Sequence, residues 1–239
     1  MTIPSPLIPR IVWQTWKTKV LPGITYEPRV SWGSKNPGWQ VRLFDDEDCR
    51  EFMRQEFPER VLRVYDSLPR PVMRADMWRY AVLAVHGGLY TDLDTTCNMP
   101  IHTWLNPKAQ LVICPEPGFH WLQWTIAAAP GHPVMREVVE EVCRRVEAGY
   151  DNSRPDFVHY YTGPWVFGDV VWKAVRAAGV TAKSSEALTR DDRAKLLESG
   201  IQAMPTGYFV NIGVKHHYGG DQWHGQHGYV GWKRDKTGQ

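Results

Sequence analysis

Two aspartates separated by one leucine, Asp92 and Asp94, lie in the segment HGGLYTDLDTT at residues 86–96. In a β-strand alternate side chains point to the same face, so both carboxylates are expected on one face, with Cα atoms about 6–7 Å apart. Two carboxylates on one face repel each other unless a cation lies between them or both project into water. The spacing therefore suggests a cation site, which only the surrounding sequence can support.

A second Asp-x-Asp sequence, at residues 46–48, shows why the spacing alone is weak. Its acidic residues suit the first turn of a helix, where carboxylates cap free amides and complement the helix dipole. The functional interpretation of Asp92 and Asp94 must rest on other groups.

A histidine pair near the C-terminus offers a third ligand type. His216 and His217 lie in KHHYGGDQW, residues 215–223, where glycines allow a ligand to approach the backbone. Two carboxylate oxygens and one imidazole nitrogen suit Mn²⁺ and related divalent ions. Such an ion could neutralise a diphosphate leaving group. Neighbouring residues of an extended segment face opposite ways, so at most one of these histidines points at a given site.

The segment before the acidic pair, PVMRADMWRYAVLAV at residues 71–85, carries charges in an apolar helix. Asp76 and Arg79 are three residues apart and can pair on one helix face. The ordinary interpretation of this spacing is an exposed ion pair worth a few tenths of a kcal/mol. However, the rest of the helix is apolar, so these charges need water or an active-site cleft.

Alternating segment types predict an α/β fold in a single domain over residues 1–239. Pro71 suits the start of the helix 71–85, and Gly87 and Gly88 suit its end. Strands are predicted at 10–16, 39–45, 89–94 and 110–116, and helices at 46–56, 58–66, 71–85, 133–148, 164–178 and 189–198, followed by a tail of strands and loops.

The composition excludes several classes of protein. The net charge of +2, with bases scattered among acids, gives no nucleic-acid-binding stripe. No signal peptide and no apolar run long enough to span a membrane is present in the sequence. The four cysteines lack metal-site spacing and are expected to be buried thiols of a cytosolic protein: Cys49, Cys97, Cys114 and Cys143.

Six segments in order give the chain a resemblance to glycosyltransferase family 32. This family has the GT-A fold, a nucleotide-sugar-binding fold whose central mixed, mostly parallel sheet is flanked by helices. It includes fungal initiating α-1,6-mannosyltransferases and sphingolipid mannosyltransferases, and clostridial glucosylating toxins are more distant relatives. The segments are IPRIVWQTWKT (8–18), NPGWQVRLFDDED (36–48), MRADMWRYAVLAVHGGLYTDLD (73–94), AAAPGHPVM (127–135), YTGPWVF (161–167) and HHYGGDQW (216–223).

The resemblance implies a bound Mn²⁺ or Mg²⁺. By position, Asp94 is expected to be a direct metal ligand, and Asp92 to contact the metal, its water or the ribose of the nucleotide. His217 corresponds to the third protein ligand, with His216 as the competing choice.

The resemblance also implies a donor site. Asp76 and Arg79 are expected to hold hydroxyls of the transferred sugar, and Tyr90 to lie near the ribose. Trp13 is expected to contact the base, with Gln14 beside it in the donor site, although core packing is the alternative for both Trp13 and Tyr90. The remaining donor-binding residues are Thr162, Gly163 and Pro164, whose alternative is a helix start, and Trp223, with Lys215 or Lys233 as further contacts to the diphosphate.

The implied reaction moves a hexose from a GDP- or UDP-sugar to a hydroxyl of a glycan or glycolipid, with retention of configuration. No carboxylate identifies itself as a nucleophile, which favours same-face attack over double displacement. Two alternatives remain: a haloacid-dehalogenase-like phosphatase that uses Asp92 as nucleophile and Asp94 as acid/base, and a non-catalytic sugar-binding module. Many eukaryotic relatives carry a membrane anchor that this sequence lacks. A cytoplasmic location, in solution or peripheral at a membrane, is therefore expected, with the Golgi lumen as the alternative for a shortened chain.

Overall fold

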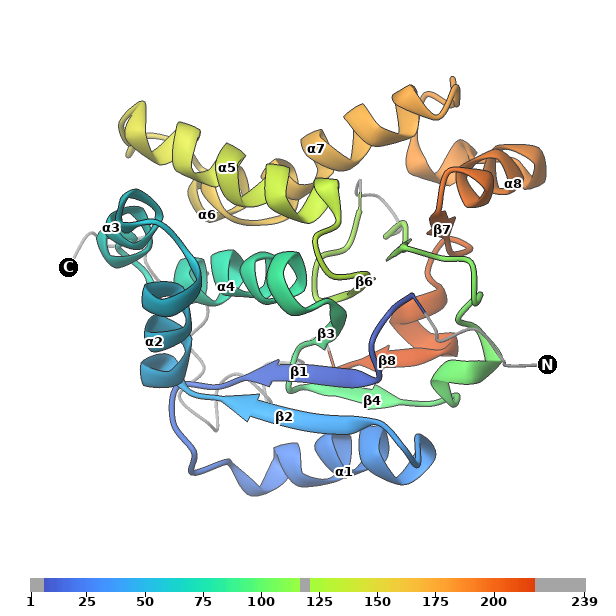
Figure 1. Ribbon diagram of the computed structural model, residues 1–239, viewed down its shortest axis with the longest axis horizontal. Coiled ribbons are helices and arrows are strands. Elements are labelled where there is room, and N and C mark those ends of the chain that lie inside the picture. Colours follow the sequence, from blue (N-terminus) through green and yellow to red (C-terminus); the bar gives the residue numbers. More distant parts are fainter. Residues whose placement is uncertain (1–6, 117–120, 218–239) are drawn as a thin grey trace.

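The computed structural model describes residues 7–116 and 121–217. Its central element is a six-stranded sheet in the order β2-β1-β3-β6-β5-β7 (Figure 1). Three of the five strand pairs are parallel, and only β6 runs antiparallel to its neighbours. The predicted mixed, mostly parallel α/β sheet is thus confirmed. The strands are β1 (Ile11–Thr15), β2 (Gln40–Phe44), β3 (Gly88–Thr91), β5 (Leu111–Ile113), β6 (Thr125–Ala128) and β7 (Ile201–Ala203).

Helices cover both faces of this sheet. One face packs against a layer that contains α4 and α5, while the other packs against α1 and a small second sheet of β4 (Thr95–Cys97) and β8 (Val214–His216) (Figure 1). The helices are α1 (Tyr26–Lys35), α2 (Asp46–Glu56), α3 (Glu59–Ser67), α4 (Pro71–His86), α5 (Pro133–Glu147), α6 (Phe157–Tyr161), α7 (Pro164–Ala177) and α8 (Arg190–Glu198).

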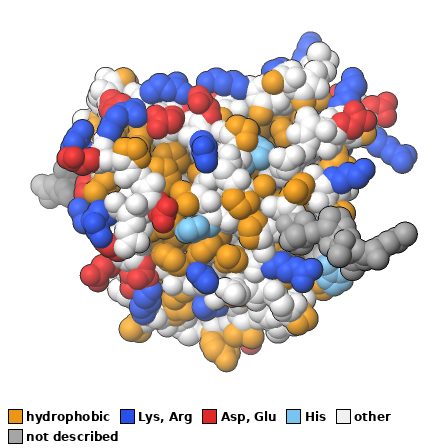
Figure 2. Space-filling model, viewed as in Figure 1, with side chains coloured by type: hydrophobic (Ala, Val, Ile, Leu, Met, Phe, Trp, Pro, Cys, Tyr) orange, Lys and Arg blue, Asp and Glu red, His pale blue; other side chains and the backbone are white. Residues whose placement is uncertain are grey.

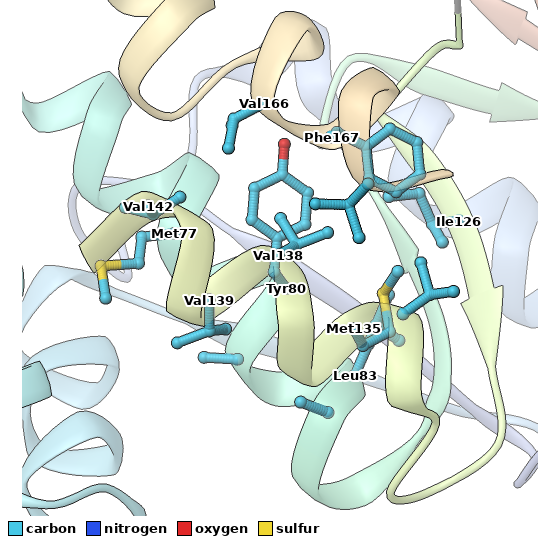
Figure 3. Close-up of a cluster of buried hydrophobic side chains, with 14 of the residues drawn as sticks. Met77, Tyr80, Leu83, Ile126, Met135, Val138, Val139, Val142, Val166 and Phe167 are labelled. Atoms are coloured by element: carbon cyan, nitrogen blue, oxygen red, sulfur yellow. The ribbon is translucent and has the colours of Figure 1, made fainter. Parts of the chain in front are cut away.

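The main core forms where α4 lies between the sheet and α5. Met77, Tyr80 and Leu83 of α4 face valines of α5 such as Val138 and Val142 (Figure 3). These α5 valines recur every fourth residue, as the sequence predicted, and they are fully buried. The packing fixes α4 rigidly against the sheet.

Two glycines join α4 to β3 with almost no loop. Gly87 caps the helix with a positive φ of 63°, and a Cβ at this position would lie 2.6 Å from the backbone nitrogen of Pro130. A Cβ at Gly88 would lie 2.7 Å from the carbonyl oxygen of Ile11. Only glycine fits such close backbone approaches, so the pair brings β3 tightly against β1.

The strand order creates a crevice at one edge of the sheet. From β1 the chain moves to β2 on one side and then returns to β3 on the other side. In open α/β sheets, ligands bind at such a reversal, outside the carboxyl ends of the two central strands. Here those ends are Thr15 of β1 and Thr91 of β3, and Asp92 follows directly.

Other sequence predictions agree with the structure to within one or two residues at most boundaries. The 46–48 acids begin α2, where Asp45 and Asp48 form a capping box. All four cysteines are buried and free. Within the described residues, no helix combines the length and the apolar character that a bilayer span requires.

Candidate active site

The acidic pair lies on a turn and not on a strand face. β3 ends at Thr91, and the backbone N–H and side-chain hydroxyl of Thr95 both donate to the carbonyl oxygen of Asp92, at 3.2 and 2.6 Å. The prediction of a strand through residue 94 is therefore wrong, because these bonds bend the chain after Thr91. The turn still presents both carboxylates at the sheet crevice, with Leu93 buried beneath them.

One histidine reaches these carboxylates from β8. Asp92, Asp94 and His216 each offer a ligand atom, and these three atoms lie within 4.8 Å of one another. This spacing allows all three residues to bind one cation. His216 Nε2 lies 3.3 Å from Asp94 Oδ1. The antiparallel pairing of β4 with β8 places His216 opposite Thr95, which explains how a residue so distant in sequence arrives here.

The structure does not bring the side chain of His217 to this cluster. Its Nε2 lies 2.8 Å from the hydroxyl of Thr96, while its backbone N–H donates to the carbonyl oxygen of Asp94 at 3.1 Å. Consecutive side chains of an extended segment point in opposite directions, so placing His216 at the acids turns His217 away. The sequence-based choice of His217 therefore differs from the observed arrangement.

The electrostatics of the cluster favour a positive partner. Burial raises the pKa of Asp92, and the neighbouring Asp94 raises it further, against the opposing effect of Arg79. Burial disfavours a charged His216, but its hydrogen bond to Asp94 and the two carboxylates raise its pKa overall. Both shifts reflect negative charge concentrated in a site with little water.

Asp76 and Arg79 of α4 form a buried ion pair next to this cluster. Their side chains are only 2% and 5% exposed, and Arg79 Nη2 lies 2.9 Å from Asp76 Oδ1. The same nitrogen lies 3.4 Å from Asp92 Oδ1. Arg79 thus connects the helix carboxylate to the acidic turn, and the interpretation as an exposed helix pair does not hold.

Arg79 has one donor that no described residue uses. Its Nε is buried and has no hydrogen-bond partner among the described residues, while its guanidinium lies 4.8 Å from the ring centre of Tyr90. The hydroxyl of Tyr90 donates to Asp92 Oδ1 at 2.7 Å. Tyr90 is buried, and its contacts orient the side chains of Arg79 and Asp92.

Asp76 accepts hydrogen bonds from two further residues. Thr162 Oγ1 donates to Asp76 Oδ2 at 3.0 Å, and Gln123 Nε2 donates to Asp76 Oδ1 at 3.1 Å. Gln123 also accepts from the hydroxyl of Tyr80, and its carbonyl oxygen accepts from Arg79 at 3.3 Å. Sequence reasoning missed Gln123 and Tyr80, because neither belongs to a spacing pattern that signals chemistry.

In the Thr162-Gly163-Pro164 segment, one residue contacts the site and two begin helix α7. Thr162 reaches Asp76, whereas Gly163 caps α7 and Pro164 is its first residue. A Cβ on Gly163 would lie 2.7 Å from the Cα of His159. The helix-start interpretation therefore applies to Gly163 and Pro164, and only Thr162 contacts the charged cluster.

The two predicted donor residues of β1 are both buried. Trp13 is 1% exposed, and its indole N–H donates to the carbonyl oxygen of Gly87 at 2.7 Å, at the end of β3 away from the acids. Gln14 lies on the opposite face and accepts from Arg29 at 3.0 Å. Neither placement offers a surface to a base. Trp16, which is also buried at 8% exposed, directly follows β1 at the crevice. Lys215 is exposed on β8, and Trp223 and Lys233 lie outside the described residues.

The buried Asp76 leads to a prediction about pH. Burial raises its pKa to about 7, against the opposing effect of Arg79, so between about pH 4 and 7 the folded chain holds a proton that the unfolded chain releases. The free energy of unfolding should therefore fall with rising pH by at most about 1.4 kcal/mol per unit through this window, and level off above it. Asp76→Asn should lose this slope, which urea denaturation at several pH values would measure. Equal slopes in both proteins would contradict the assignment.

Comparison with known proteins agrees with the site. Residues 27–111, which include Asp76 and the acidic turn, match the family described as "Glycosyltransferase sugar-binding region containing DXD motif". The chain is 28% identical over 190 residues to the initiation-specific α-1,6-mannosyltransferase of Schizosaccharomyces pombe, covering 69% of this chain and 48% of that protein. It is 34% identical over 173 residues to inositol phosphoceramide mannosyltransferase 3 of the same yeast, covering 72% of this chain and 47% of that protein.

The matches cover only part of each curated relative, and one solved structure shares the fold. The chain spans about half the length of the curated relatives that it matches. Among solved structures, PaToxG glycosyltransferase superposes with a TM-score of 0.58 at 17% identity, over 81% of this chain and 78% of that one, which shows a shared fold. The chain therefore has the GT-A fold and contains the DXD-type glycosyltransferase region over residues 27–111, and the predicted resemblance to glycosyltransferase family 32 is confirmed.

Proposed function

We propose that this chain transfers a hexose from a nucleotide-diphosphate sugar to an acceptor hydroxyl, with a divalent cation bound at the acidic turn. The observation that carries the proposal is the convergence of Asp92, Asp94 and His216 beside the buried Arg79–Asp76 pair. Two carboxylates and one imidazole fit Mn²⁺. Mg²⁺ is the alternative, and since it prefers oxygen ligands it would rest mainly on the two carboxylates. Three protein groups would leave ligand positions on such an ion for phosphate oxygens.

Each group has a distinct role in this proposal. When bound, the cation supplies positive charge that stabilises the departing diphosphate. Asp94 and His216 would hold the cation directly, and Asp92 would complete the set while keeping its contact with Arg79. The unused Nε of Arg79 and the carboxylate of Asp76 offer one donor and one acceptor to sugar hydroxyls. Trp16, at the carboxyl end of β1, takes the place proposed from sequence for Trp13 against the nucleobase.

The donor in this proposal is a GDP- or UDP-hexose, with mannose the sugar suggested by the names of the relatives. The acceptor is a glycan or a glycolipid. Asp76 is occupied by Arg79 and Thr162, and the turn carboxylates face the cation, so none is free to attack the anomeric carbon. We therefore favour same-face attack assisted by the leaving phosphate. A hexose adduct on the intact protein, detected by mass spectrometry after incubation with donor alone, would overturn this mechanism.

The test of function is nucleotide release from a panel of UDP- and GDP-sugars, with Mn²⁺ and then with chelator. Slow release from one donor that requires the metal supports the proposal and identifies the sugar. Release of phosphate from simple phosphoesters would support the phosphatase alternative instead. Metal-dependent nucleotide binding without turnover, even with candidate acceptors present, would support the non-catalytic sugar-binding alternative.

The two histidines can be separated by mutation. His216→Ala is expected to weaken Mn²⁺ binding by at least about tenfold, because it removes a ligand and not merely a supporting contact. His217→Ala removes the bond to Thr96 and is expected to change Mn²⁺ affinity much less. Calorimetric titration of both variants with Mn²⁺ measures the difference, and a larger effect at His217 would restore the sequence-based choice.

A further inference from the structure

Exposed apolar side chains gather on one short segment of the surface. Seven large hydrophobic residues are exposed among the described residues, and four of them lie within residues 20–30. We call these four the α1 patch: Val20 (82% exposed), Ile24 (38%), Tyr26 (69%) and Val30 (44%). Hydrophobic side chains are visible at the lower rim of the molecule in Figure 2, where α1 lies in Figure 1.

Two residues of the patch lie on the outer side of α1, whose inner side is buried, and Val20 and Ile24 precede this helix. Tyr26 and Val30 are four residues apart and share one face of α1. Pro28 and Trp32, on the other side, are buried. The patch therefore does not result from an unfinished core, and its apolar groups are free to contact another surface.

The segment that carries the patch is basic. Residues 17–35 contain four basic residues and one acidic residue, a net charge of +3, whereas the whole chain has +2, which leaves −1 for all other residues. Lys17 is exposed and forms no ion pair among the described residues, while Lys19 pairs with Asp45 and Asp48. Exposed apolar groups in a basic segment suit an anionic lipid surface, which attracts both.

The patch is close to the proposed active site. Arg29 of α1 donates to Gln14 near the carboxyl end of β1, and the indole N–H of Trp32 donates to the carbonyl oxygen of Thr95 at 3.0 Å. Thr95 directly follows Asp94. The inner side of α1 therefore contacts the residue next to the acidic turn, while its outer side carries Tyr26 and Val30 of the patch.

We propose that the α1 patch, with Lys17 and Lys19, docks this protein on an anionic lipid bilayer and so presents the active-site crevice to acceptor hydroxyls at the membrane surface. The acceptor part of this inference rests on the proposed function. The docking part rests on exposure and charge alone, so the two can fail separately.

The test is co-sedimentation of the whole chain with vesicles of phosphatidylcholine, with and without phosphatidylserine. Binding is expected only with phosphatidylserine, and should weaken when the salt concentration is raised from 0.1 to 1 M, since the screening length shortens from about 10 to about 3 Å. Lys17→Gln should weaken partitioning about fivefold, since each lysine near such a surface is worth about 1 kcal/mol. The triple variant Val20→Ser, Tyr26→Ser, Val30→Ser should lose binding.

Matched controls make the outcome decisive. Ile212→Ser changes an equally exposed hydrophobic residue, 53% exposed on another segment, and should bind vesicles as the wild type does. All variants should keep the metal-dependent release of nucleotide in solution, so a failure of the enzyme proposal would appear there and not in sedimentation. No binding by the wild type, or equal binding by the triple variant, would overturn the docking proposal. If the wild type is a dimer and the triple variant is a monomer, the patch serves self-association instead.

Discussion

Replacing Asp94 by asparagine is expected to reduce metal-dependent nucleotide release by at least about a thousandfold. The variant keeps the size of the side chain but removes the charge that holds the cation. Stabilisation of a leaving group by a bound metal is worth several kcal/mol, and about 1.4 kcal/mol corresponds to a tenfold change in rate. Initial rates with the preferred donor at saturating Mn²⁺ would measure the loss, and direct titration should show weaker Mn²⁺ binding.

The matched control for this prediction is Asp191→Asn. Asp191 is exposed in the first turn of α8, which packs against β7 at the far edge of the sheet. The same chemical change there should leave the rate within about twofold, because surface substitutions act within about half a kcal/mol. Nearly wild-type turnover by Asp94→Asn would contradict the cation site, and it would direct attention to the other carboxylates near the crevice.

Sequence patterns predicted most of the fold because they record local physics. Pro71 at the start of α4, two glycines at its end and the four-residue valine spacing of α5 each act within one element. Elements without such patterns were missed. Helix α1 contains Pro28 and Gly33, and β6 is rich in alanine; the pairing of β6 with β3 and β5 stabilises that strand through contacts distant in sequence.

The candidate site was predictable in type but not in detail. The carboxylates, the ion pair and a histidine from the tail could be proposed from residue types and spacing. The choice between His216 and His217 depends on the register of β8 with β4, which one residue of slip would reverse. Gln123 comes from the segment just before β6, and it bonds to both Asp76 and Tyr80 of α4 only because the chain folds these segments together, which no local pattern records.

Arg79→Met is expected to lower the free energy of unfolding by about 3–5 kcal/mol as well as abolish transfer. Breaking a buried ion pair is costly because the remaining charge keeps its desolvation penalty without its partner. Here Asp76 and Asp92 would both lose the guanidinium of Arg79 as their ion-pair partner. Asp76, whose pKa burial has already raised to about 7, would then take up a proton. Urea denaturation at neutral pH measures the stability, and the turnover assay measures the loss of the sugar contact.

An exposed pair with the same spacing serves as the control. Glu51 and Arg54 are also three residues apart on a helix, but their side chains are 45% and 55% exposed. Arg54→Met should therefore change the free energy of unfolding far less than Arg79→Met does and leave turnover unchanged. Arg79→Lys keeps the charge but lacks the planar fork that reaches Asp76, Asp92 and the carbonyl of Gln123 together. We expect this variant to recover much of the stability and little of the transfer, because stability needs a positive charge in this pocket, whereas transfer needs donors in fixed directions. Full recovery of transfer by lysine would show instead that charge alone suffices and that Arg79 does not orient the sugar.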